Sequence, residues 1–288
     1  MTDVSVIVLD VDGGEMLLAC LDSIAAQTMP PSEVIVFDNG SRIPVAERIA
    51  FRHGLHIFRS ETNRGFAGGN NEAYRHATGA YIALINNDVV LDRDWLATVV
   101  AALDADPKLA AVQTILRRDE TTIDGAGIDI SDGTFRQISH DAGVGSRGSG
   151  VGVKSTSLVP TPDTRPPTPA QAWGVSATAA LYRREALGET IFDASLFAYY
   201  EDVELNARLH ESGWRTEVLL VIKATHRGSQ SAPLLGGDAL RLRTRNRYLV
   251  ARRHRGVGRI GALLLEDVKL ALRGRASIRG VLQGLFTR

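Results

Sequence analysis

Cysteine is almost absent from this sequence of 288 residues, since Cys20 is the only one. The chain therefore cannot form an internal disulfide, which fits a reducing compartment and a cytoplasmic location. No apolar run approaches the roughly 18 residues that suggest a membrane-spanning helix. The first residues, MTDVSVIVLDVDGG, lack the basic segment and cleavage site of a signal peptide, so they are interpreted as the first strand of a domain.

Two common kinds of catalytic or structural motif are also missing. The sequence has no Cys-X-X-Cys and no second His or Cys at the spacing of a zinc site. It has no G-x-S-x-G motif either, so it does not indicate a hydrolase with a serine nucleophile at a strand-to-helix turn.

A formal net charge of zero conceals a strong asymmetry. Residues 241–288 hold 13 Lys and Arg but only two acids, whereas the rest of the chain holds 20 bases and 31 acids. The basic tail also contains Leu263, Leu264, Leu265, Val268, Leu270 and Leu272. A basic amphipathic helix is typical of a segment that binds an anionic membrane surface. Packing of the tail on the acidic body and a dimerisation arm that forms a homo-oligomer are the alternatives.

Short apolar runs alternate with segments of helical periodicity in the first part of the chain. The runs at 4–10, 33–38 and 80–86 have the pattern of buried parallel strands, and a helix is predicted over 45–51. Strands and helices alternating at this spacing predict an α/β fold with a mainly parallel sheet flanked by helices.

The pattern changes after about residue 106. Residues 121–130, TTIDGAGIDI, are predicted to form a strand that leads to a turn at 131–133. Residues 141–169 are rich in Gly, Ser, Thr and Pro, which predicts a long loop that orders over a substrate. EVLLVIKATH (217–226) predicts another strand, and basic helices follow Pro233.

Polar residues follow the predicted strands where the carboxyl ends of a parallel sheet bind ligands. Asp38-Asn39 ends one strand and Asn87-Asp88 ends another. A single Asp there suits a divalent cation that bridges two phosphates, although both segments are also good turn sequences.

Three further features suggest a site but are weak in isolation. The glycine-rich turn at 63–70 opens a helix and suits a phosphate. Glu201 and Asp202 open another helix, where acids also cap or favour the helix dipole. Because neighbouring helical positions point about 100° apart, only one of these two is expected to face a cleft. His226 ends a strand, and a lone His is more often structural than a metal ligand.

In their order along the chain, these segments resemble the family 2 glycosyltransferases, and above all the bacterial rhamnosyltransferase-like branch. The resemblance runs from about Val4 to Ser231. It rests on SVIVLDVDGGEMLLACLDSIAAQT, EVIVFDNGS, NRGFAGGNNEAYRHATGAYIALINND, FDASLFAYYEDVELNARLHESGW and His226 with RGS. It implies a Rossmann-like GT-A fold and inverting transfer of a sugar from a nucleotide-sugar donor.

The resemblance also implies a role for each matching residue. Asp202 is then the catalytic base, supported by Glu201, and Asp88 and His226 hold Mg²⁺ or Mn²⁺. Asp38 recognises the nucleotide base. The other donor-binding residues are Asn39, Arg64, Gly65, Gly68, Gly69 and Asn87.

The family pattern also suggests a division of the chain. Residues 1–232 form the GT-A domain, with a donor half at about 1–105 and an acceptor half at about 106–232, and 233–288 form a basic helical extension. Two departures are Val11-Asp12-Gly13, where the family often has Tyr-Asn-Gly, and the single carboxylate of Asn86-Asn87-Asp88.

The expected reaction is a single displacement with dTDP-rhamnose or a UDP-sugar as donor. The acceptor would be a lipid-linked saccharide or a cell-envelope glycan, reached from the inner face of the membrane. The alternatives are a sugar-1-phosphate nucleotidyltransferase, which VLDVDGGEM disfavours because it lacks a basic residue, and a non-catalytic nucleotide-sugar binder. No nucleic-acid partner is expected, because Tyr248 and Phe286 are the only aromatic residues of the basic tail.

Overall fold

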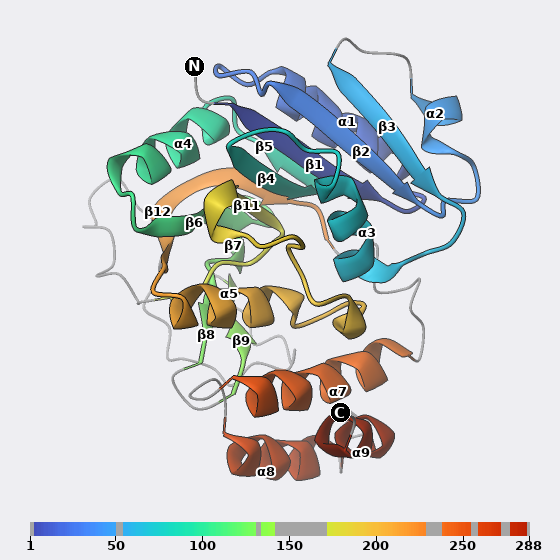
Figure 1. Ribbon diagram of the computed structural model, residues 1–288, viewed down its shortest axis with the longest axis vertical. Helices are drawn as coiled ribbons and strands as arrows, with labels where there is room; N and C mark the ends of the chain where they lie inside the picture. The colour runs from blue at the N-terminus through green and yellow to red at the C-terminus, as the bar shows by residue number, and fades with distance from the viewer. Residues whose placement is uncertain are drawn as a thin grey trace.

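The computed structural model of the protein describes residues 3–49, 54–130, 134–141, 172–228, 238–254, 259–271 and 277–286 (Figure 1). The predicted turn at 131–133 and almost all of the predicted loop at 141–169 lie outside the described residues.

The N-terminal half is a regular alternation of strands and helices, as the sequence predicts. Its strands lie in the order β3-β2-β1-β4, and every neighbouring pair is parallel. The elements are β1 (Val4–Asp10), α1 (Gly14–Ala25), β2 (Glu33–Asn39), α2 (Val45–Arg48), β3 (Leu55–Ser60), α3 (Gly65–Tyr74) and β4 (Tyr81–Asn86). The predicted helix at 45–51 is shorter, because Ile49 already has an extended backbone.

The rest of the sheet is mixed. β11 lies antiparallel between β4 and β6, whereas β12 pairs parallel with β6 and antiparallel with β5. The elements are β5 (Val89–Leu91), α4 (Trp95–Ala105), β6 (Leu109–Arg117), β7 (Thr122–Gly125), β10 (His140–Asp141), β11 (Ala179–Arg183), η1 (Arg184–Ala186), η2 (Ala194–Leu196), α5 (Glu201–Glu211) and β12 (Arg215–His226).

The prediction of one strand at 121–130 is wrong, because the structure has two strands there. The segment is split into β7 and β8 (Ile128–Asp129), and β8 pairs with β9 (Arg136–Gln137) in a separate small sheet. The break falls at Gly127, whose φ of 94° is a conformation that favours glycine.

Helices cover both faces of the main sheet, and alternate residues of β1 point to the two faces. Val6 and Val8 pack in a buried cluster with residues of α1 and α4. Ile7 belongs to a second cluster with residues of α3 and α5. The fold is therefore the α/β arrangement that the sequence predicts, with a hydrophobic core on each side of the sheet.

The described part of the C-terminal extension contains three helices: α7 (Asp238–Arg253), α8 (Ile260–Ala271) and α9 (Ile278–Phe286). α7 runs beside α5, with α8 and α9 on its far side (Figure 1). Leu249 and Val250 of α7 pack with Val203 and Ala207 of α5. His254 lies between Glu204 and Glu211, 3.4 Å and 3.0 Å away. α7 thus docks on the acidic body, as one of the alternatives for the basic tail expects.

α9 approaches α7 closely because two glycines face it. A Cβ atom on Gly284 would lie 2.4 Å from the carbonyl oxygen of Arg245, and one on Gly280 would lie 2.7 Å from that of Arg241. None of the described helices has the length and hydropathy needed to cross a membrane.

Replacing Gly284 with Ala should therefore push α9 away from α7. We expect the docking of α9 on α7 to lose about 1–3 kcal/mol of free energy. Hydrogen exchange of the α9 amides should then be at least about tenfold faster. Gly261→Ala is the matched control, because nothing lies within 4 Å of its added Cβ and Ala is the better helix former. Equal exchange in the two variants would contradict this packing.

Candidate active site

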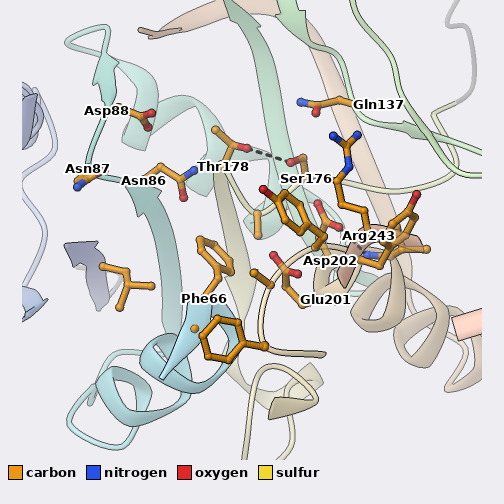
Figure 2. A pocket seen from close by; sticks show the side chains of 18 of the residues that line it. Phe66, Asn86, Asn87, Asp88, Gln137, Ser176, Thr178, Glu201, Asp202 and Arg243 are labelled. Atoms are coloured by element: carbon orange, nitrogen blue, oxygen red, sulfur yellow. Dashed lines mark hydrogen bonds between the residues drawn. The ribbon is translucent and has the colours of Figure 1, made fainter. Parts of the chain in front are cut away.

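A pocket of about 360 Å³ opens at the carboxyl ends of the parallel strands. Leu9, Asn39 and Asn86 reach it from β1, β2 and β4, which is where ligands bind in open α/β sheets. Its other walls come from the start of α3, residues 176–178, residues 197–203, His226 and Arg243 of α7. Figure 2 shows Asp88 on one side of this pocket and Arg243 on the other, with Glu201 and Asp202 between them in the view.

Strand pairing brings Asp88 and His226 together. β12 pairs antiparallel with β5, so His226 lies opposite Val89, the residue after Asp88. Asp88 Oδ1 is 3.2 Å from His226 Nε2, is buried, and accepts no hydrogen bond from any described residue. A buried carboxylate oxygen without a partner, next to an imidazole nitrogen, fits two ligands of a divalent cation.

Asp124 of β7 holds the other side of the His226 ring. Its Oδ2 is 2.5 Å from His226 Nδ1, and its Oδ1 pairs with the guanidinium of Arg118. Burial lowers the pKa of His226, but its contacts with Asp124 and Asp88 outweigh burial and raise the pKa to about 9. A carboxylate on the second ring nitrogen is the usual support of a metal-binding histidine.

Two residues are too few to hold a cation without other ligands. Among the residues that the structure describes, no group of three or more His, Cys, Asp and Glu side chains is arranged as a metal site. Mg²⁺ and similar ions commonly take one or two protein ligands and complete their shell with substrate phosphates and water. The pair therefore fits a cation that arrives with a phosphate-bearing ligand.

Glu201 and Asp202 both line the pocket, so the expectation that only one of them faces a cleft is wrong. They open α5 directly after Tyr200, whose φ of 70° is left-handed. Glu201 Oε2 is buried and has no hydrogen-bond partner among the described residues. Burial, followed by the charge of Asp202, raises the pKa of Glu201 to about 8.

The surroundings of Asp202 differ from those of its neighbour. Burial raises its pKa too, although hydrogen bonds from Val203 N, 2.8 Å away, and from Ser176 and Ala177 offset part of that effect. A carboxylate with a raised pKa has an increased affinity for a proton, as a general base requires.

Only some of the predicted donor-binding residues reach the pocket. Asn39, Gly65 and Asn87 line it. The side-chain amide of Asn39 donates to the Gly65 carbonyl at 3.1 Å, and that of Asn87 donates to Asp10 at 2.6 Å. These contacts fix the rim at the ends of β1, β2 and β4.

The other four predicted donor residues lie outside the pocket lining. The Asp38 carboxylate accepts from the backbone of Ser41 and Val45 and pairs with Arg59. Burial raises its pKa, but these contacts lower it overall. Arg64, Gly68 and Gly69 lie in the turn and first part of α3. Arg64 pairs with Glu72 at 3.3 Å, and a Cβ on Gly69 would lie 2.5 Å from Leu9.

The family model described as glycosyl transferase family 2 matches residues 5–191, more than half of the chain. The chain belongs to that family. The match ends before Glu201, Asp202 and His226, so the structure adds these residues to the site. Their roles and those of the donor residues stay predictions.

The matches to individual relatives are shorter than the match to the family model. The chain is 31% identical over 115 residues to poly-beta-1,6-N-acetyl-D-glucosamine synthase of Staphylococcus epidermidis. That match covers 35% of this chain and 28% of the synthase. A second match, to an uncharacterized protein y4gI of Sinorhizobium fredii, covers 11% of that protein. The chain thus spans less than a third of the curated relatives that it matches.

Solved structures share the fold at low identity. Mannosyltransferase PcManGT from Pyrobaculum calidifontis, in complex with GDP-Man and Mn²⁺, has a TM-score of 0.59 at 20% identity, over 97% of this chain and 77% of that one. S. aureus TarS 1–349, in complex with UDP-GlcNAc, has a TM-score of 0.58 at 17% identity, over 98% and 78%. These likenesses confirm the GT-A fold.

Several residues at this pocket are difficult to predict as site residues from the sequence. Arg243 belongs to the tail that charge alone assigns to a partner outside the protein. Asp124 is one acid in a predicted strand, and only the fold places it against His226. Phe197, Tyr199 and Tyr200 line the pocket with φ values of 63°, 71° and 70°.

Asn246 of α7 holds this strained segment. Its side-chain amide nitrogen lies 2.8 Å from each of the carbonyl oxygens of Leu196, Ala198 and Tyr199, so its two N–H groups are shared among three acceptors. Arg245 donates to the Asn246 Oδ1 at 2.8 Å, which fixes the orientation of the amide. Non-glycine residues at positive φ cost of order 1–3 kcal/mol each, so the segment depends on these contacts.

Asn246→Ala should release the strained segment and leave buried carbonyls without donors. We expect a loss of unfolding free energy of about 1–3 kcal/mol or more in urea denaturation, with faster exchange of the amides of 197–203. Asn246→Asp keeps the shape but replaces the donors with an acceptor, so it should be at least as unstable. Full stability of the Asp variant would show that packing, and not hydrogen bonding, holds the segment.

Proposed function

We propose that the protein is an inverting glycosyltransferase that moves a hexose from a nucleoside-diphosphate sugar to an acceptor hydroxyl. One observation carries this proposal: the buried Glu201 and the half-buried Asp202 open into the same pocket as the Asp88–His226 pair (Figure 2). The first pair can take a proton from an acceptor, while the second can hold the diphosphate end of a donor. Family membership favours glycosyl transfer over the nucleotidyltransferase alternative.

Asp202 acts as the base in this proposal. It takes the proton of the acceptor hydroxyl while the hydroxyl oxygen forms a bond to the anomeric carbon. The bond from that carbon to the diphosphate breaks, and the nucleoside diphosphate leaves with the electron pair. Attack from the face opposite the diphosphate inverts the anomeric centre. Glu201, with its unpartnered oxygen, accepts a hydrogen bond from the acceptor.

Mg²⁺ or Mn²⁺ is the proposed cofactor, with Asp88 and His226 as its protein ligands. When bound there, the cation neutralises charge on the leaving diphosphate as a Lewis acid. Asp124 orients His226 by accepting from the second ring nitrogen.

The proposed donor is dTDP-rhamnose or a UDP-sugar, by resemblance to the rhamnosyltransferase-like branch. Asn39, Gly65 and Asn87 contact it from the pocket wall. Asp38 is proposed to recognise the base, with carboxylate oxygens that already accept from Ser41 and Val45. Arg64, Gly68 and Gly69 support the adjacent turn. The complexes of TarS with UDP-GlcNAc and of PcManGT with GDP-Man support a nucleotide-sugar donor of this general kind.

The proposed acceptor is a lipid-linked saccharide or a cell-envelope glycan, met at the inner face of the membrane. The exposed sides of α8 and α9 support this location. Each carries apolar residues away from α7, namely Leu264, Leu265 and Val268 on α8 and Ile278, Leu282 and Phe286 on α9. Exposed Lys269 and Arg279 lie on the same two helices, and exposed Arg259 directly precedes α8. Apolar and basic residues together suit an anionic membrane surface.

Asp202→Asn should lower kcat by at least about 100-fold, the usual contribution of a general base, with donor binding nearly unchanged. Glu201→Gln should retain more activity, because the amide keeps an oxygen at the same place. Both acids have raised pKa values, so kcat should rise with pH as Asp202 loses its proton. A fully active Asp202→Asn variant would exclude Asp202 as the base.

Donor binding should depend on a divalent cation and on the residues that hold it. In calorimetric titrations of UDP with Mn²⁺ present, Asp88→Ala and His226→Ala should abolish the effect of Mn²⁺, and Asp124→Asn should weaken Mn²⁺ binding about 10–100-fold. Asp94→Asn is the control, since this acid pairs with Lys223 outside the pocket. Activity that survives a chelator unchanged would contradict the metal role.

Binding to vesicles tests the proposed location. The protein should sediment with anionic vesicles at low salt and less at high salt, since each basic residue adds about 1 kcal/mol at most. Leu282→Glu should weaken binding, whereas Ile43→Glu, on an exposed residue outside the extension, should not. Negligible binding to both anionic and neutral vesicles would contradict the proposal. Salt-resistant self-association that Leu282→Glu disrupts would identify a homo-oligomer seam instead.

A further inference from the structure

Arg243 is the one lysine or arginine among the described residues that line the pocket. It comes from α7, contacts Tyr199, and lies on the same side of the pocket as Gln137 and Ser176 (Figure 2). In that view it lies across the pocket from Asp88, beyond Asp202. It therefore stands away from the diphosphate end of the proposed donor site and on the side from which an acceptor reaches the base.

The guanidinium of Arg243 is available to a ligand. It lies 5.5 Å from the centre of the Tyr199 ring, which holds it by a cation–π contact. Within the part of the chain that the structure describes, no carboxylate pairs with it. Arginines elsewhere on α7 are engaged: Arg245 donates to the Ser195 carbonyl at 2.6 Å, and Arg247 pairs with Glu266 at 3.4 Å.

The position of Arg243 is fixed relative to the acids. Asn246 lies three residues further along α7, on the same face of the helix, and clamps the segment that leads into Glu201 and Asp202. The part of α7 that carries Arg243 is thus held against the segment that carries Tyr199 and the two acids. A support of this kind is what a binding subsite requires.

We propose that Arg243 binds an anionic group of the acceptor, a phosphate or a carboxylate, so that the acceptor is an anionic saccharide. This inference rests on the proposed function. Two acids beside the attacking hydroxyl would repel such an acceptor, and a single guanidinium on the same wall offsets that repulsion. The planar guanidinium group of arginine can also donate two parallel hydrogen bonds to two oxygens of one phosphate or carboxylate.

The test uses the full chain with Mn²⁺ and saturating UDP, which fills the donor side. Binding of glucose 1-phosphate, glucuronate and methyl glucoside is then followed by NMR. We expect the wild type to prefer one of the two anions over the neutral glucoside by about tenfold or more. Whether the phosphate or the carboxylate is preferred identifies the kind of acceptor.

Arg243→Gln should remove this preference, Arg243→Lys should keep part of it, and Arg279→Gln, which removes a charge from exposed α9, should keep all of it. An anion preference that survives in Arg243→Gln, or a loss confined to UDP binding, would overturn the inference. UDP binding by the wild type tests the proposed function separately from the role of Arg243. A wild type that binds no UDP or other nucleotide would contradict the proposed function, while the anion comparison would still decide the role of Arg243.

Discussion

The hydrogen bonds from Asn246 to the segment before α5 are the contacts on which the acidic wall of the pocket depends. Three residues of that segment have positive φ, a conformation that bulky side chains do not adopt unaided. The amide of Asn246 satisfies three of its carbonyls at 2.8 Å. A helix outside the family match therefore holds the segment that leads into the two acids, and the C-terminal extension lines the pocket through Arg243.

The opposite wall is built by a different constraint, the antiparallel pairing of β12 with β5. That pairing sets His226 next to Asp88, and β7 supplies Asp124 to the other ring nitrogen. The resulting pocket has the proposed cation-binding side on the sheet and the proposed proton-accepting side at the start of α5. A single displacement needs this separation, because the base and the leaving group must lie on opposite faces of the sugar.

The sequence predicts the donor half well, because each buried strand there is a continuous apolar run that ends at polar residues. It also predicts Asp88, His226, Glu201 and Asp202 as site residues, although through a family resemblance and not through spacing alone. It predicts less where long-range packing decides the outcome. A glycine at 127 redirects a predicted strand, and the Asp38 carboxylate is engaged by its own turn. Charge counting cannot show that part of the basic tail is interior, since Asn246 and Leu249 carry no charge.

The anomeric configuration of the transferred sugar tests the central claim most directly. The donor is first identified from a panel of nucleotide sugars by thermal shift with Mn²⁺ or Mg²⁺, and the reaction is then followed by proton NMR from the first minutes. One base opposite one diphosphate predicts a product whose anomeric configuration is inverted relative to the donor. Retention of the donor's configuration would contradict the single displacement and the role assigned to Asp202.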